Sequence, residues 1–165
     1  MGLANWLRNG LTVDTRACGI PDTSPSAQRP RWMCDGMRAT EVVGDDALRV
    51  VGLPGHQDVL WSIVGRDNPG PVRQDIHALL VAEHGNPFDR NAVAVWVGGQ
   101  RVGRLHERDA GRLRPGLIRL QRAHQRAVAL PGHVGGGRDD GLGVYLNYDA
   151  DAFGVSPRTK GIPHA

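Results

Sequence analysis

The stretch that most constrains the fold of this chain is a predicted β-hairpin at residues 92–105. Residues 92–97 read Ala-Val-Ala-Val-Trp-Val, so apolar side chains point to both faces of a predicted strand. Gly98 and Gly99 follow, and because glycine tolerates positive φ, this pair favours a two-residue type I′ turn. Residues 100–105 return as the partner strand, which completes a rigid hairpin.

A dense turn signal leads into the hairpin, with the sequence Asn-Pro-Phe-Asp-Arg-Asn at residues 86–91. The Asn-Pro pair starts turns, and Asp and Asn side chains hydrogen-bond to their own backbone. A polar loop that carries an aromatic ring at the root of a rigid hairpin is well suited to hold a ligand. The loop is therefore the first candidate for a binding site.

Composition limits the class of protein. The 165 residues give room for one domain and a tail, and 23 glycines and 11 prolines favour many turns over long helices. The net charge is +3, and Lys160 is the only lysine. A GC-rich genome is one explanation of this arginine bias, and the other is phosphate binding, for which arginine is the better side chain.

Several classes of function are not expected. Cys18 and Cys34 lie far apart and near no histidine cluster, which favours a reducing, cytoplasmic compartment. No apolar run is long enough to span a membrane, and residues 1–11 are too short and too polar for a signal peptide. The sequence contains neither a Walker-type glycine loop nor a metal-ligand cluster. We therefore expect no enzyme activity, catalytic residue, metal or cofactor.

The order of predicted elements indicates one domain at residues 45–149, between a flexible arm at 1–44 and a flexible tail at 150–165. Strands are predicted at 47–53, 76–83, 127–130 and 143–148, in addition to the hairpin. Helices are predicted at 57–64 and 108–125, the second being either one kinked helix or two short ones because of Pro115. The glycine-rich residues 135–141 are expected to form a flexible loop. This order predicts a mainly β (α+β) fold, a small OB-like barrel capped by two or three helices.

The same residues resemble a known family. A Val-Val-Gly at residues 50–52 precedes a short helix, the Asn-Pro-aromatic-Asp core at 86–89 precedes Asn-Ala-Val, and Val-Gly-Arg-Leu at 102–105 precedes the next helix. This combination closely resembles the HIRAN domain over residues 46–148, in its stand-alone bacterial or phage type. The resemblance implies an OB-like barrel that captures the 3′ end of single-stranded DNA during DNA repair or replication-fork processing.

The resemblance also implies roles for individual residues. Asp89 matches a carboxylate that accepts a hydrogen bond from the terminal 3′-hydroxyl, and Phe88 matches an aromatic residue that packs on the terminal nucleotide. Asn86 matches a polar contact to that nucleotide. Arg104 falls at a basic or imidazole position that can hold a phosphate, and Arg108 lies close by.

Two departures from the family pattern affect the site. Where end-binding members carry a basic residue and an aromatic, this chain has Pro54 and Gly55, which leaves His56 as a stacking residue. A lysine expected after the Val-Gly-x-Leu motif is replaced by Glu107. These changes favour an alternative function, in which the barrel docks onto a nuclease or helicase without recognising a DNA end.

Structural roles compete with binding roles at several positions. Asp89 and Asn91 can act as turn caps, and Phe88 can plug one end of the barrel. The arginines that follow the hairpin form either a solvated helix face or a phosphate track: Arg101, Arg104, Arg108, Arg112, Arg119, Arg122 and Arg126.

Overall fold

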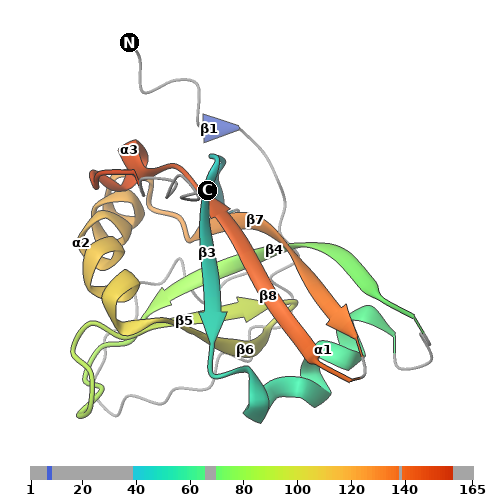
Figure 1. Ribbon diagram of the computed structural model, residues 1–165. Helices are drawn as coiled ribbons and strands as arrows, with labels where there is room; N and C mark the ends of the chain where they lie inside the picture. The colour runs from blue at the N-terminus through green and yellow to red at the C-terminus, as the bar shows by residue number, and fades with distance from the viewer. Residues whose placement is uncertain (1–6, 9–38, 66–69, 138, 158–165) are drawn as a thin grey trace, which may run out of the picture.

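The computed structural model describes residues 7–8, 39–65, 70–137 and 139–157. Six strands close into an antiparallel barrel in the order β4-β5-β6-β3-β8-β7, and β7 pairs with β4 to complete the ring (Figure 1). The predicted fold class, a mainly β barrel with short helices, is confirmed. The strands are β3 (Asp46–Val51), β4 (Val72–Ala82), β5 (Val93–Val97), β6 (Gln100–Leu105), β7 (Val128–Gly137) and β8 (Gly141–Tyr148).

Short helices lie on opposite sides of this barrel (Figure 1). A 3-10 turn η2 (Leu53–His56) leads directly into α1 (Gln57–Val64), and α2 (Glu107–His124) follows β6. Leu60 of α1 and Leu117 of α2 are fully buried in the same core as the inward-facing strand residues. The helices therefore complete a single hydrophobic core, whose strand residues include Leu48, Val50, Leu80, Val93, Val95, Val102, Leu130, Val144 and Leu146.

The predicted hairpin is present as β5 and β6. Gly98 and Gly99 adopt φ values of 56° and 76°, as a type I′ turn requires. Gly103 has a different role, because a Cβ there would lie 2.5 Å from the carbonyl oxygen of Val51. Only glycine therefore lets β3 cross so close to β6, and this crossing closes the barrel.

One continuous helix, α2, occupies residues 107–124, which decides between the two arrangements predicted for this segment. Pro115 lies within it and is exposed, so the ring faces solvent. Leu113, Leu117 and Leu120 are buried on the opposite face. Packing of that face on both sides of the proline holds the helix together despite the missing backbone donor.

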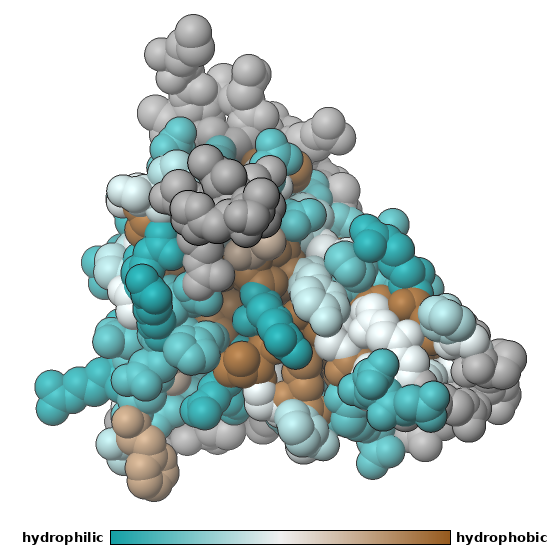
Figure 2. Space-filling view, viewed as in Figure 1, coloured by the Kyte–Doolittle hydropathy of each residue, from teal (hydrophilic) through white to brown (hydrophobic). Residues whose placement is uncertain are grey.

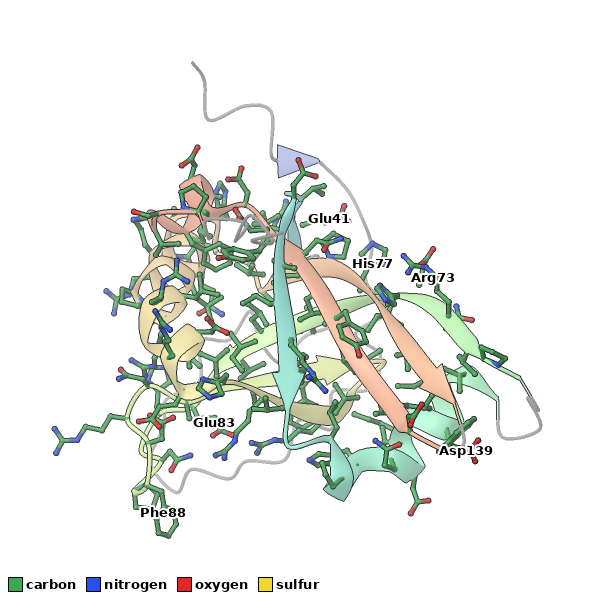
Figure 3. The ribbon with its side chains drawn as sticks, in the orientation of Figure 1. Glu41, Arg73, His77, Glu83, Phe88 and Asp139 are labelled. Atoms are coloured by element: carbon green, nitrogen blue, oxygen red, sulfur yellow. The ribbon has the colours of Figure 1, made fainter. Side chains whose placement is uncertain are left out.

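The glycine-rich residues 135–141 differ from the predicted flexible loop. β7 extends to Gly137, and Gly135 pairs with Gly143 while Gly137 pairs with Gly141. Glycines carry no side-chain pattern, so the ladder that orders them is visible only from the partner strand. Asp139 and Asp140 are the described residues between the two strands of this second hairpin, and Figure 3 shows Asp139 at that end.

The ordered part of the chain begins before residue 45. β2 (Thr40–Val42) pairs in parallel with the start of β7, and β1 (Leu7–Arg8) pairs with β2. Glu41 is 5 % exposed, and its Oε1 lies 3.0 Å from Nε2 of His77 on β4 (Figure 3). The boundary predicted at residue 45 therefore lies inside the packed structure. The remainder of the predicted arm, residues 1–6 and 9–38, lies outside the described residues.

The predicted flexible tail begins with a packed segment. Asp149 caps α3 (Ala150–Phe153), accepting hydrogen bonds from the N–H groups of Asp151 and Ala152. Phe153 is 2 % exposed and makes an edge contact with Tyr148 at 5.9 Å between ring centroids. An aromatic anchor thus continues the domain to at least Phe153, and residues 158–165 lie outside the described part.

Candidate functional site

The loop between β4 and β5 is organised by the side chain of Asn86. Its Oδ1 accepts hydrogen bonds from the backbone N–H groups of Phe88 (2.9 Å) and Asp89 (3.1 Å). Its Nδ2 donates to Oε2 of Glu83 at 2.9 Å. Asn86 therefore shapes the loop, with one amide hydrogen left over for a further partner.

An ion pair braces this loop at its root. Oε1 of Glu83 lies 2.8 Å from Nη1 of Arg101 on β6, and Glu83 is largely buried. The connection from Arg101 through Glu83 to Asn86 ties the loop to the barrel wall. Sequence reasoning missed Glu83, because its role depends on how β4 and β6 are placed in the folded sheet.

Asp89 has a structural role and retains one unused oxygen. Its Oδ1 accepts from the N–H of Asn91 at 2.8 Å, and its backbone carbonyl accepts from Ala92. Its Oδ2 has no hydrogen-bond partner among the described residues. The expected turn chemistry is therefore present, and half of the carboxylate remains able to accept a further hydrogen bond.

Phe88 stands at the tip of this loop and is 98 % exposed. It points away from the body of the protein (Figure 3), and Figure 2 shows an apolar side chain projecting at the same place. Phe88 therefore does not plug the barrel. The apolar faces of the ring are therefore open to solvent, and a partner that covers them would remove a large apolar area from water.

The predicted basic residues lie on two consecutive elements, β6 and α2. Arg104 of β6 is exposed and pairs with Ala94 on one side and Val51 on the other. Arg108 is exposed in the first turn of α2 and donates its backbone N–H to Nδ1 of His106, the capping residue. Neither guanidinium makes a hydrogen bond or ion pair with the described residues, so both are able to bind an anionic group.

Other arginines of the run bind backbone carbonyls of the C-terminal segment. Arg112 donates to the carbonyl of Ser156 at 2.7 Å, and Arg119 donates to the carbonyl of Ala152 at 2.9 Å. These two side chains fasten the C-terminal segment to α2, as Arg101 fastens the loop. The run is therefore not one continuous phosphate track.

Two arginines lie close to His84 at the base of the loop. Nη2 of Arg114 lies 3.4 Å from Nδ1 of His84, which directly precedes the turn. Partial burial lowers the pKa of His84 from its usual 6.5, and the nearby guanidinium groups of Arg114 and Arg122 lower it further. The base of the loop therefore carries basic side chains beside the carboxylates of Glu83 and Asp89.

A cavity of about 580 Å³ opens between β3, β8 and the starts of α1 and α2. Its lining includes residues 49–54, so Pro54 lines it, whereas Gly55 and Glu107, the other residues that depart from the family pattern, do not. Arg104 lies next to the cavity, because a Cβ on the lining residue Gly52 would be 3.9 Å from Cγ of Arg104. Figure 2 shows apolar surface exposed on this face along β3, between polar side chains. The volume is within the range of small-ligand sites.

Gln57, a residue that lines the cavity, links α1 to β8. Its amide bridges to the backbone of Leu142 twice, accepting from the N–H and donating to the carbonyl, each at 2.9 Å. Gln57 thereby pairs with β8 as an extra strand residue would. His56, one residue earlier, is partly buried at the end of η2 and does not line the cavity.

Other classes of site find no support in the described part of the chain. No group of three His, Cys, Asp or Glu side chains there could hold a metal ion. None of the helices there is long and apolar enough to cross a membrane.

Comparison with known proteins adds no assignment to this geometry. No protein-family model, curated protein or solved structure matches the chain.

Proposed function

We propose that this chain is a non-catalytic, HIRAN-type module that binds single-stranded DNA, preferably at a free 3′-hydroxyl end. The observation that carries the proposal is Phe88, an almost fully exposed ring at the tip of a braced loop. Stacking of one base on an aromatic side chain contributes about 1–3 kcal/mol. A preformed loop limits the entropy lost when the base binds.

The free oxygen of Asp89 supports recognition of the end itself. An ionised carboxylate only accepts hydrogen bonds, so it favours a terminal hydroxyl and repels a terminal phosphate. Its other oxygen is already engaged by the N–H of Asn91, which fixes the orientation of the carboxylate. The remaining amide hydrogen of Asn86 supplies a second polar contact.

Arg104 and Arg108 complete the proposed site as phosphate contacts. Both guanidiniums are exposed, and neither has a side-chain partner among the described residues. If these two arginines hold two phosphates, the logarithm of the binding constant falls with the logarithm of salt concentration with a slope of about −1.4. The cavity beside Arg104 would then receive the nucleotide next to the end.

Fluorescence anisotropy with matched oligonucleotides tests this proposal. One oligonucleotide ends in a 3′-hydroxyl and the other in a 3′-phosphate. We expect the wild-type protein to prefer the hydroxyl. Asp89→Asn keeps an acceptor for the turn but removes the charge, so it should bind the two ends more equally. Equal binding of both ends by the wild-type protein would sink the end-recognition claim.

A second candidate function is docking onto a nuclease or helicase. Pro54 and Gly55 favour it, because neither position offers a basic or an aromatic side chain to a nucleic acid. An exposed phenylalanine also fits a hydrophobic pocket of a protein partner. Co-purification that survives nuclease treatment and is lost in Phe88→Ala, together with no oligonucleotide binding, would favour this alternative.

A further inference from the structure

A row of side chains crosses the outer face of the barrel beyond the cavity. Arg49 of β3 pairs with Tyr145 of β8, which pairs with His133 of β7. The rings of Tyr145 and His133 stack with centroids 5.2 Å apart and planes inclined by 24°. Tyr145 is 39 % exposed, and with Phe88 it is one of two aromatic residues in the described chain with a substantially exposed ring.

Glycines clear the surface next to this ring pair. Gly143 and Gly135 face each other across β8 and β7, two residues before Tyr145 and two residues after His133. A Cβ on Gly143 would lie 3.0 Å from the Tyr145 ring, and one on Gly135 would lie 3.3 Å from the His133 ring. The Tyr145 ring therefore packs over the backbone of Gly143, and the His133 ring over that of Gly135. Neither glycine carries a side chain that would cover the adjacent ring face.

Two arginines flank the pair. Arg49 stands opposite Tyr145 and makes no side-chain hydrogen bond or ion pair with described residues. Nη1 of Arg73 on β4 lies 3.4 Å from Nε2 of His133, and Figure 3 shows Arg73 on the outer side of the barrel. Asp75, opposite His133 on β4, ends the row with a negative charge that disfavours a phosphate beyond it.

The row is continuous with the cavity, because Arg49, Gly143 and Tyr145 also form part of the cavity lining. A strand that occupies the cavity would therefore contact Tyr145. A cross-strand ring pair also stabilises a sheet, but that role does not require a cleared surface or an unpaired arginine.

We propose that this face is a second nucleic-acid contact, on which Tyr145 stacks a base and Arg49 holds a phosphate of the strand leaving the cavity. The inference rests on the proposed function and adds a subsite to it. It gives this chain a stacking residue in the cavity lining, which Pro54 does not supply. The occupant is single-stranded nucleic acid, because ring stacking and free guanidiniums match bases and phosphodiesters.

The test is binding as a function of oligonucleotide length, with 3′-hydroxyl oligothymidylates of about 4 and about 12 nucleotides, which bracket the site sizes of OB-type barrels. Tyr145→Ala should weaken binding of the long oligonucleotide by about 5- to 150-fold and weaken binding of the short one by a smaller factor. Tyr145→Phe keeps the ring and should bind as wild type. Asn147→Ala, on the same exposed face of β8, is the matched control and should change neither affinity.

Each outcome decides the inference. It is overturned if Tyr145→Ala binds the long oligonucleotide as wild type does, or weakens both lengths equally. If the wild-type protein binds neither length, the proposed function and this inference fail together. If Phe88→Ala reduces binding of both lengths while Tyr145→Ala has no effect, only the second contact is wrong. Thermal unfolding of each variant identifies any loss of affinity that comes from misfolding.

Discussion

The two phenylalanines of this chain make a matched pair with opposite expected behaviour. Phe88 is 98 % exposed and Phe153 is 2 % exposed. Replacing Phe88 by alanine removes almost no buried surface, so the free energy of unfolding should change by less than about 0.5 kcal/mol. Replacing Phe153 empties a packed site against Tyr148, which should cost about 3–5 kcal/mol.

These free energies convert into separable measurements. For a domain of this size, Phe153→Ala should lower the melting temperature by about 6–20 °C, whereas Phe88→Ala should lower it by less than about 2 °C. Binding of a 3′-hydroxyl oligonucleotide should show the reverse order. Phe88→Ala should lose about 1–3 kcal/mol, or about 5- to 150-fold in Kd. Phe153→Ala, measured well below its melting temperature, should bind as wild type.

The assays are differential scanning calorimetry for stability and fluorescence anisotropy for affinity, with the same protein preparations. If Phe88→Ala binds as wild type, the stacking role is refuted. If Phe88→Ala loses more than about 1 kcal/mol of stability, Phe88 packs against another part of the protein and the exposed tip is an incorrect description.

Three further changes test the fold and the loop. Gly116→Ala should destabilise the protein by about 1–3 kcal/mol in chemical denaturation, because the new Cβ would lie 2.2 Å from the carbonyl oxygen of Phe153; wild-type stability would contradict this packing. Asn86→Ala removes the acceptor of two loop N–H groups and should weaken DNA binding with a loss of stability of about 1–2 kcal/mol; unchanged hydrogen exchange at the loop tip would contradict its organising role. The pKa of His84 is lowered in the folded protein, so near this pKa the folded state binds fewer protons than the unfolded state. The neutral form of His84 therefore contributes to the free energy of unfolding above pH 6.5, and this contribution is lost as the pH falls below that value. An NMR titration should place the pKa of His84 below 6.5 and closer to it in Arg114→Ala; an equal pKa in both proteins would show that Arg114 has no effect.

Elements that depend on local sequence were predictable. The helix expected at residues 57–64 is α1 with the same bounds, and the hairpin has its turn at Gly98 and Gly99. Both follow from periodicity and turn chemistry within a few residues, and no distant partner is needed to specify them. The barrel followed from the number and order of such elements.

Elements that depend on distant partners were not predictable. β2 is ordered by pairing with β7, more than eighty residues later, and Gly137 is ordered by β8. α3 is placed by the burial of Phe153 against Tyr148 and α2. Short or glycine-rich segments carry too little side-chain pattern to identify these partners. From sequence alone, the three segments were therefore predicted as a flexible arm, a flexible loop and a flexible tail.

The candidate site was predictable in composition and less so in geometry. The turn chemistry of Asn86 and Asp89 follows from their residue types, and the hydrogen bonds of both side chains are present. The outward direction of Phe88 does not follow from its neighbours in sequence. The ion pair of Glu83 with Arg101 depends on the placement of two strands, and it had no signal in the sequence.

The central claim is that a single strand of DNA binds at the loop of residues 86–91 and the adjoining cavity. The most direct test is a two-dimensional NMR titration of the labelled protein with a 3′-hydroxyl oligonucleotide. The account predicts that backbone amide signals of residues 86, 88–91, 49–53 and 104 shift together with one affinity, and that those of α3 remain fixed. Shifts confined to α2 and α3, or no shifts at all, would contradict it.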